Sequence, residues 1–343
     1  MRKTGAVLTI ICDEPLALRV AERDPPARAG DELLVRIRRV GLCGTDYHIY
    51  AGDQPFLSYP RVMGHELAGE IVEAPAGSAF HPGQAVTINP YLACGHCVAC
   101  RADKPNCCAN VAVLGVHTDG GMAELIAVPE RAAIDATGLT PEQAAMVEFL
   151  AIGAHAVARA RLRPGSRALV KGAGPIGLGT ALFARLDGAA VTLCDSRQPR
   201  LDRAARDFGF DSLVLADDDA QARFAAMTGG DFFETVFDAT GNLAAMRDGL
   251  QQVAHGGSYV LVSVVKGDLV FADPEFHKRE TTLIASRNAL AADFARVIAA
   301  IRDGTIATGA LHTHSIDAPD LPRRLPELID AADAVLKAIV RFD

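Results

Sequence analysis

The sequence lacks an apolar run long enough to cross a membrane, and it lacks any excess of basic residues. No uninterrupted apolar stretch reaches the ~18 residues that a spanning helix needs. The 34 Lys and Arg residues are outnumbered by 42 Asp and Glu residues, which gives a formal net charge of −8, and no Lys/Arg cluster occurs. Because phosphates require a basic binding face, nucleic acid is excluded as an expected partner. We expect a globular protein that engages neither membranes nor nucleic acid.

The chain also lacks the marks of an exported, disordered or repetitive protein. The apolar stretch Ala6–Cys12 has no small-residue cleavage site and predicts a first strand, so we expect a cytoplasmic protein. Hydrophobic residues make up 50% of the chain and charged residues 22%, which is too apolar for intrinsic disorder. Since single cores stop growing at about 250–300 residues, the length of 343 residues favours two domains.

The pattern of apolar residues changes near residue 150. Before it, alternating segments divided by Gly- and Pro-bearing turns predict a mostly β region, with strands at 33–37, 66–72, 84–88 and 124–128. Behind Thr140, which can cap a first turn, helical spacing predicts one helix over Ala144–Arg161. Strands and helices then alternate, which predicts an α/β fold with a parallel sheet covered on both faces. The expected segments are 168–170, 176–186, 190–194, 200–208, 212–215, 235–237, 258–265 and 291–302.

Cysteine is the unusual part of the composition, with eight residues. Cys94, Cys97, Cys100 and Cys108 have the spacing C-x2-C-x2-C-x7-C in a stretch rich in Gly, Pro and Asn. Disulfides at such short spacing would be strained, whereas four thiolates so placed can surround one tetrahedral zinc ion. A closed shell of four sulfurs leaves no open position, so we expect this zinc to be structural. Cys107 is the alternative fourth ligand, and buried cysteines without a metal are the simpler alternative.

A second group combines a thiol, an imidazole and a carboxylate in two glycine-bearing segments, 41–48 and 64–66. Cys43, His65 and Glu66 are ligands of the kinds that, together with a water, form a catalytic zinc site. A core cysteine and a core histidine without any metal are the alternative. The four-cysteine group nearby favours the metal.

Polar side chains around this second group suggest supporting roles. Thr45 and His48 are suited to carrying a proton outward from an alcohol. Asp46 is expected to orient His65 as a hydrogen-bonded carboxylate. Glu148 lies inside an apolar stretch, so it is either a cleft carboxylate near the metal or the start of a helix face, and we favour the former.

A glycine motif, G-x-G-x-x-G, stands at 172–177 between a predicted strand and a predicted helix. Asp195 ends the next strand, 18 residues after Gly177, where a carboxylate can accept the two ribose hydroxyls of adenosine. An acidic residue there repels a 2′-phosphate, so NAD is preferred over NADP, although Arg197 could compensate. A turn needed only for helix–strand packing is the alternative. The expected cofactor contacts in this loop are Gly172, Gly174, Pro175, Ile176 and Gly177.

Further candidates for cofactor and substrate contacts follow other strands of the second half. Thr240 comes after the predicted strand 235–237, on the side of the sheet where cofactors bind. Ser286, Arg287 and Asn288 are polar residues after an apolar strand, for which simple solvent exposure is the alternative. Arg200 completes the expected cofactor contacts.

With these motifs in place, the sequence resembles the zinc-dependent medium-chain alcohol dehydrogenases, in particular the branch that contains polyol, threonine and sugar-acid dehydrogenases. The resemblance covers essentially the whole chain and keeps the order of its motifs. Segment 273–282 is most similar to the sugar-acid members such as the L-galactonate 5-dehydrogenases. Phe149 is a departure, because this branch commonly carries Pro there. The matching motifs are 41–48, 64–66, the four cysteines, 120–124, Glu148 and the glycine motif.

The resemblance implies a GroES-like catalytic domain, residues 1–148 and 288–343, around a Rossmann NAD-binding domain, residues 149–287. It implies that Cys43, His65 and Glu66 hold a catalytic zinc, with water and Glu148 exchanging at the remaining position. It also assigns Arg287 to substrate or cofactor binding. The family implies a homodimer or homotetramer, and the apolar segment 258–265 is a candidate for pairing across an interface.

The expected function is the transfer of hydride between NAD and a secondary alcohol on a polyol or on a sugar acid, an aldonate such as L-galactonate. Two zinc ions per chain are expected, one catalytic and one structural. The alternatives within enzymes are an L-threonine 3-dehydrogenase or a sorbitol dehydrogenase activity. The alternative outside enzymes is a zinc-stabilised structural protein that keeps a cofactor pocket.

Overall fold

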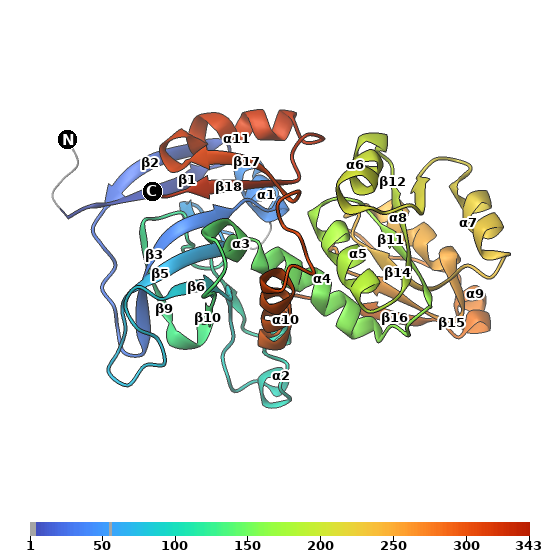
Figure 1. Ribbon diagram of the computed structural model, residues 1–343, viewed down its shortest axis with the longest axis horizontal. Helices are drawn as coiled ribbons and strands as arrows, with labels where there is room; N and C mark the ends of the chain where they lie inside the picture. Colours follow the sequence, from blue (N-terminus) through green and yellow to red (C-terminus); the bar gives the residue numbers. More distant parts are fainter. Residues whose placement is uncertain (1–4, 55–56) are drawn as a thin grey trace. The chain divides into compact units, whose positions relative to one another are not determined.

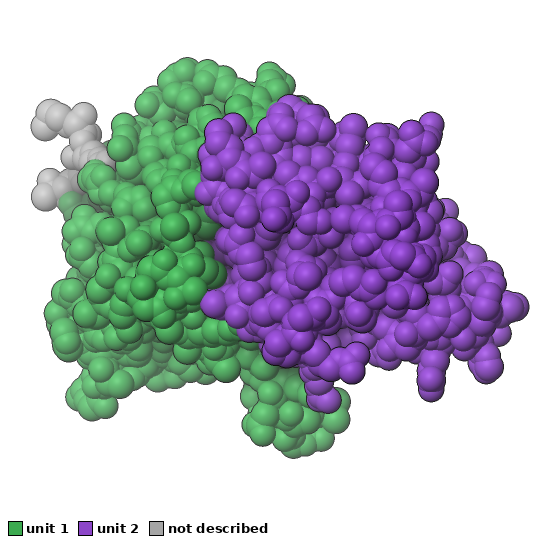
Figure 2. Space-filling view, turned by 45° about the vertical axis from the view of Figure 1, so that its right-hand side comes forward, with its two compact units in different colours: residues 1–148, 290–343 green, residues 149–289 purple. Residues whose placement is uncertain are grey.

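A computed structural model of the chain describes residues 5–54 and 57–343 (Figure 1). The chain divides into two compact units, residues 1–148 with 290–343 and residues 149–289 (Figure 2). Unit 1 is discontinuous in sequence because unit 2 is inserted into it. The second boundary falls between Ala289 and Leu290, slightly later than the expected 287/288.

Unit 1 is rich in β-structure. Its larger sheet has the strand order β10-β6-β5-β3-β18-β17, with β9 also paired to β3, and a smaller sheet has the order β2-β1-β4. The strands are β1 (Val7–Glu14), β2 (Ala17–Arg23), β3 (Glu32–Gly41), β4 (Arg61–Val62), β5 (Glu66–Glu73), β6 (Ala85–Ile88), β7 (Tyr91–Leu92), β8 (Ala112–Val113), β9 (Leu125–Pro129), β10 (Ala133–Asp135), β17 (His312–Asp317) and β18 (Lys337–Arg341). The helices are α1 (Gly44–Ala51), α2 (Val98–Arg101), α3 (Pro141–Ala145), α10 (Ala291–Arg302) and α11 (Leu321–Asp330).

The centre of the larger sheet explains how this unit is stabilised. In β3, Leu33, Val35 and Ile37 are fully buried, whereas Arg36 is exposed, as the period-two pattern of a strand with one covered face requires. Strand β18 pairs antiparallel with β3 although it comes from the end of the chain. The core of unit 1 is therefore built from both of its sequence segments.

Unit 2 is a doubly wound α/β unit. Its six-stranded sheet has the order β13-β12-β11-β14-β15-β16, and every pairing in it is parallel. Strands β11 to β13 advance toward one edge and β14 to β16 toward the other, so right-handed crossovers place the connecting helices on opposite faces. The strands are β11 (Arg167–Lys171), β12 (Ala190–Asp195), β13 (Leu213–Leu215), β14 (Phe233–Asp238), β15 (Val253–Leu261) and β16 (Thr282–Ala285). The helices are α5 (Pro175–Leu186), α6 (Gln198–Phe208), α7 (Ala220–Thr228), α8 (Leu243–Gly249) and α9 (Asp273–Arg279), and α4 (Val147–Ala160) runs from unit 1 into unit 2.

The predicted α/β class is confirmed, including the β-rich part and the parallel sheet. Two details of the prediction are wrong. The single helix expected over 144–161 is two helices: a capping box of Thr140 and Gln143 starts α3 at Pro141, α3 ends at its C-cap Met146, and α4 begins at Val147. The strand expected over 258–265 ends at Leu261, and β15 pairs with β14 and β16 on its two sides, so it is not free to pair across an interface. The edge strand on this side of the sheet is β16, and the opposite edge strand is β13.

No helix among the described residues is both long enough and apolar enough to span a membrane.

Candidate active site and metal centres

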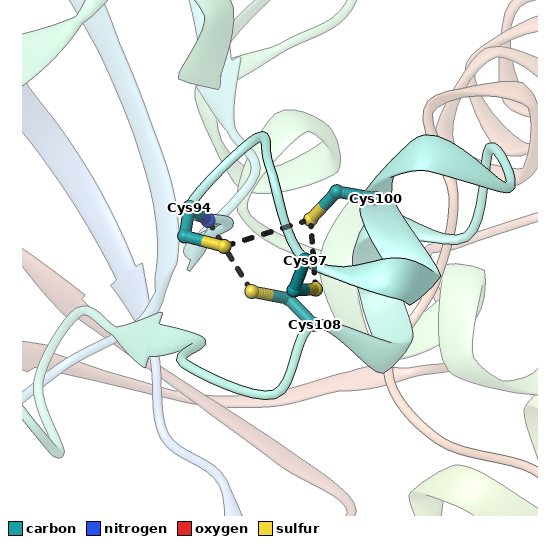
Figure 3. A group of neighbouring side chains, drawn as sticks. All are labelled: Cys94, Cys97, Cys100 and Cys108. Atoms are coloured by element: carbon teal, nitrogen blue, oxygen red, sulfur yellow. Dashed lines mark hydrogen bonds between the residues drawn. The ribbon is translucent and has the colours of Figure 1, made fainter.

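The four cysteines of the C-x2-C-x2-C-x7-C segment converge on one point of unit 1 (Figure 3). Cys97 is the N-cap of α2, Cys100 lies within that helix, and Cys94 and Cys108 approach from the flanking segments. Their four sulfur atoms all lie within 4.8 Å of one another, with Cys97 and Cys100 3.5 Å apart and Cys94 and Cys100 4.0 Å apart. Tetrahedral zinc with Zn–S bonds of ~2.3 Å needs sulfurs about 3.8 Å apart. The group fits a zinc ion without rearrangement.

Backbone amides favour negative charge on two of these sulfurs. Amides of His96 and Cys97 donate to the Cys94 sulfur and lower the pKa of Cys94 to about 6. Amides of Cys100 and Ala109 act likewise on Cys97 and lower its pKa to about 7. Thiolates are the form that binds metal, so these amides favour the binding form of Cys94 and Cys97, whereas burial and the neighbouring thiols raise the pKa of Cys100 to about 12. Cys107 is exposed and does not belong to the group, which leaves Cys108 as the fourth ligand.

Helix α1 positions the first residue of the second group. Cys43 is its N-cap, and its sulfur accepts a hydrogen bond from the Thr45 amide at 3.4 Å. The positive end of the helix dipole therefore faces a sulfur that must carry negative charge when it binds a metal. Thr45 is half-buried in the first turn, and His48 is exposed one turn later on the same side of the helix.

Asp46 does not orient the imidazole of His65 as predicted. Its fully buried carboxylate accepts hydrogen bonds from the backbone amides of Cys43 at 3.0 Å and Gly64 at 3.2 Å. His65 Nδ1 is buried and has no hydrogen-bond partner among the described residues. Asp46 therefore joins the two candidate ligand segments through their backbones.

His65 is shared by two groups of candidate metal ligands. It lies with Cys43 and Asp46 in one group and with Glu66 and Glu148 in the other, and the ligand atoms within each group are all within 4.8 Å of one another. His65, Glu66 and Glu148 are all buried. A thiolate, an imidazole with an orphaned nitrogen and two carboxylates fit the ligand preferences of zinc.

The negative charges in this group of side chains also favour the binding of a cation. Burial opposes a charged imidazole, yet the negative charges of Cys43, Asp46 and Glu148 outweigh it and raise the pKa of His65 well above its usual value. Burial raises the pKa of Glu148 to about 7. A bound metal ion would supply further positive charge to balance these acidic groups.

The glycine loop of unit 2 connects β11 to α5. Gly172 has φ +94°, a left-handed conformation that a side chain would strain, and a Cβ on Gly177 would lie only 1.7 Å from the Gly172 carbonyl oxygen. Gly174 is the N-cap of α5, and Pro175 opens the helix at a position where a missing N–H costs nothing. The loop stands at the carboxyl end of β11, next to β14, where the order of the strands reverses.

These features can be compared with known proteins. The family model for the alcohol dehydrogenase GroES-like domain matches residues 29–138, and that for zinc-binding dehydrogenases matches residues 175–303. L-galactonate-5-dehydrogenase of Escherichia coli K12 is 41% identical over 334 residues, which are 97% of this chain and 98% of that protein. The chain belongs to the zinc-binding alcohol dehydrogenases.

Two further relatives give the breadth of this family. An L-threonine 3-dehydrogenase of Sinorhizobium medicae is 34% identical over 253 residues, 71% of this chain and 72% of that protein. The crystal structure of an alcohol dehydrogenase (rspB) from Escherichia coli CFT073, in complex with NADH, superposes with a TM-score of 0.92 at 27% identity. That comparison covers 98% of this chain and 100% of the other.

The carboxylate predicted for the ribose in this zinc-binding dehydrogenase is Asp195, at the end of β12. It is buried, and it accepts hydrogen bonds from the backbone amides of Ala173 at 2.7 Å and Arg197 at 2.9 Å. Arg200 Nη1 lies 3.6 Å from Oδ2, the oxygen that also accepts the Ala173 amide. Asp195 therefore ties the glycine loop to the start of α6.

The remaining candidates in unit 2 follow β14 and β16. Thr240 is held by Asp238, which accepts hydrogen bonds from the Thr240 amide at 3.0 Å and the Thr240 hydroxyl at 2.7 Å. Ser286 donates its amide to Leu261, and its buried hydroxyl has no partner among the described residues. Arg287 is exposed, and Asn288 is half-buried with φ +55°.

Two residues beside the candidate zinc ligands escaped the sequence analysis. The Tyr91 hydroxyl donates to Glu148 Oε1, and burial raises the pKa of Tyr91 well above its usual value. Lys337, at the start of β18, contacts both carboxylate oxygens of Glu66. A lysine that opens an otherwise apolar strand, Ala338-Ile339-Val340, is the signal that could have drawn attention to it.

Proposed function

We propose that this chain is an oxidoreductase that transfers hydride between NAD and a secondary alcohol of a polyol or a sugar acid, with an aldonate such as L-galactonate as the preferred class. The observation that carries the proposal is that His65 lies within 4.8 Å of Cys43 in one group of potential metal ligands and within 4.8 Å of the buried carboxylates of Glu66 and Glu148 in another. The 41% identity to L-galactonate-5-dehydrogenase over nearly the whole chain supports the substrate class.

Cys43, His65 and Glu66 are the proposed ligands of a catalytic zinc, and Glu148 shares the remaining position with water. When bound, zinc polarises the alcohol oxygen and NAD accepts the hydride. His65, Glu66 and Glu148 are buried and Cys43 is half-buried, and this burial strengthens electrostatic interactions at the site. Cys94, Cys97, Cys100 and Cys108 are the proposed ligands of a second, structural zinc.

Thr45 and His48 are the proposed path for the alcohol proton. The half-buried Thr45 hydroxyl lies two residues after Cys43, and the exposed His48 imidazole lies one turn further along α1. Side chains at i and i+3 share one face of a helix, so a proton can pass from the buried end of α1 toward solvent.

The glycine loop, with Asp195 and Arg200, is the proposed site for the pyrophosphate and adenosine ribose of NAD. Gly172, Gly174, Pro175, Ile176 and Gly177 let the backbone approach the phosphates at the amino end of α5. Thr240, Ser286 and Asn288 are proposed as further cofactor contacts, and Arg287 as a substrate contact. An acidic residue at 195 disfavours NADP, and the NADH bound to the similar rspB structure supports the choice of NAD.

The alternative substrates are L-threonine, as the name of the 34% identical relative suggests, and a polyol such as sorbitol. A screen of NAD⁺ reduction against L-galactonate, sorbitol and L-threonine, each with NADP⁺ as the comparison, tests the proposal. We expect the highest kcat/KM with the sugar acid and NAD⁺. No turnover with any secondary alcohol, together with only one zinc per chain, would favour a zinc-stabilised binding protein instead.

Two serine variants separate the roles of the metal sites. Cys43→Ser is expected to lose one zinc per chain and nearly all activity while its melting temperature stays close to wild type. Cys97→Ser is expected to lose the other zinc and to melt at lower temperature, because a structural zinc contributes directly to folding. Equal losses of stability with activity intact in both variants would contradict the assignment.

We also propose that the protein is a cytoplasmic homodimer or homotetramer. None of the eight cysteines is in a disulfide, which suits a reducing compartment. The short edge strand β16 exposes Leu283 and offers unpaired backbone groups, so it is a better candidate for pairing between copies than β15. Light scattering of Leu283→Lys against wild type tests this, since the proposal requires a smaller mass for the variant.

A further inference from the structure

A buried lysine faces the candidate zinc ligands from the last strand of unit 1. Lys337 is 2% exposed, and its ammonium lies 2.7 Å from both Glu66 Oε1 and Glu66 Oε2. The same ammonium donates to the Leu42 carbonyl oxygen at 3.0 Å. An ammonium has three donors, and these three acceptors match them.

Three neighbouring strands bring these groups together. Strand β18 is paired antiparallel to β3, with Ile339 opposite Gly41, and β3 is paired to β5, with Gly41 opposite Glu66. A Cβ on Gly41 would lie 2.0 Å from Glu66 Oε2, so the carboxylate fits only because residue 41 is glycine. Glu66 is thus confined between the backbone of β3 and the ammonium of Lys337.

The lysine therefore links the two segments that carry the candidate ligands. Leu42 precedes Cys43, and Glu66 follows His65. One ammonium therefore binds both the residue before Cys43, through its carbonyl oxygen, and the residue after His65, through its carboxylate. Among the described residues, the other potential metal ligands grouped with His65 are Cys43, Asp46, Glu66 and Glu148, and each is negative when ionised. A cation from the protein and a divalent metal ion would compete for the same carboxylate.

We propose that Lys337 is a positioning residue that shares the Glu66 carboxylate with the catalytic metal, and so keeps Glu66 a weak, exchangeable ligand and one metal position open to substrate. This inference rests on the proposed function. Because Lys337 already neutralises Glu66, this carboxylate contributes less to the binding free energy of the metal than an unpaired carboxylate would. Removal of the lysine charge leaves Glu66 uncompensated in the metal-free protein, so the metal then binds it more strongly.

The test compares Lys337→Met with wild type, measured as the rate at which a chelator removes zinc from the purified holoenzyme. Release should occur in two phases, and the catalytic phase is the one that Cys43→Ser lacks. We expect this phase to slow by about tenfold in Lys337→Met, and we expect the rise in melting temperature on zinc loading to be larger than in wild type. Lys337→Arg, which keeps the charge, should release zinc at close to the wild-type rate.

Two further variants test whether Lys337 acts through Glu66. In a Glu66→Gln background the additional Lys337→Met change should have little effect, because no carboxylate is left to compete for. Lys171→Met is a matched control, since Lys171 is also buried but donates to Ala245 in unit 2, and it should leave zinc release unchanged. Lys337→Gln, a neutral residue that retains donors, replaces the Met variant if that protein does not fold.

The outcomes separate this inference from the proposed function. A wild-type protein with only one zinc, confined to the cysteine cluster, refutes the proposed function. Two zincs in wild type, with zinc released faster or at an unchanged rate in Lys337→Met, refute the role of Lys337 alone. The role of Lys337 is also refuted if Lys337→Met changes the rate of zinc release equally in the wild-type and Glu66→Gln backgrounds.

Discussion

Gly177→Ala tests the reasoning about the glycine loop most directly. A methyl group at Gly177 would lie 1.7 Å from the Gly172 carbonyl oxygen and 2.8 Å from the Gly172 carbonyl carbon. A normal C···O contact is at least ~3.3 Å, so about 1.6 Å of overlap must be relieved by moving the backbone of the loop. Gly172 is at φ +94°, which limits how the loop can move.

The expected losses of stability and of NADH affinity in Gly177→Ala follow from this overlap. Overpacking of a buried position costs ~1–3 kcal/mol and occasionally more, and backbone atoms yield less readily than side chains, so we expect about 3 kcal/mol in the free energy of unfolding. For a unit of this size each kcal/mol lowers the melting temperature by ~2–4 °C, which predicts a loss of roughly 6–12 °C. Loss of one hydrogen bond to a charged group costs ~1.5–3 kcal/mol, so the Kd for NADH should rise at least about tenfold.

Gly174, the N-cap of α5, and Gly179, within that helix, serve as controls. A Cβ on Gly174 meets nothing closer than Arg200 Nη1 at 3.7 Å, and one on Gly179 meets Leu150 Cδ2 at 3.4 Å, an ordinary contact. Gly179→Ala should keep wild-type NADH binding and gain up to ~1 kcal/mol from helix propensity. Gly174→Ala should keep its melting temperature but weaken NADH binding, because only the proposed pyrophosphate would meet its methyl group.

Thermal melts give the melting temperature of each of the three variants, and fluorescence titrations give its Kd for NADH. The reasoning is refuted if Gly177→Ala melts and binds like Gly179→Ala. It is equally refuted if Gly174→Ala loses as much stability as Gly177→Ala, since the structure offers no clash at that position.

Two shorter predictions concern unit 1. Burial alone would raise the pKa of Glu142, but its hydrogen bond with Arg39 and the Arg39 charge outweigh burial and lower it. A carboxyl with a lowered folded-state pKa stabilises the fold above its unfolded pKa of ~4.3 and loses that contribution as pH falls. The advantage of wild type over Arg39→Met, about 1 kcal/mol by urea unfolding at pH 7, should therefore shrink below about pH 4, and an undiminished difference at pH 3 would contradict this. His48→Gln should lower kcat by about 100-fold with zinc content and the Kd for NADH unchanged, and a variant with full kcat would remove His48 from the proton path.

The parts of the site that were predictable share one property: their spacing is local. Four cysteines within 15 residues and three glycines within six leave the chain few ways to place them apart. Their chemistry, thiolates around a metal and a backbone that approaches phosphates, follows from residue type. The family resemblance rests on the same motifs and is confirmed by matches over 29–138 and 175–303.

The errors concern hydrogen bonds that the apolar pattern does not encode. Asp46 is expected to orient the imidazole of His65, but its carboxylate accepts from the backbone amides of Cys43 and Gly64, and His65 Nδ1 has no partner among the described residues. The capping box of Thr140 and Gln143 starts a short helix at Pro141, ahead of the helix expected from residue 144. Periodicity records which side chains are apolar, and it does not record which hydrogen bonds are available.

The sequence by itself determined the α/β class and the residue types of both candidate metal sites, because periodicity and residue type can be read along the chain, and the family resemblance implied that one unit is inserted into the other. Only the tertiary structure decided that Lys337 lies against Glu66, 271 residues away, and that Tyr91 lies against Glu148. Those pairings depend on the register of β18, β3 and β5 and on how buried polar groups find partners in a packed core. No pattern within a short window encodes them.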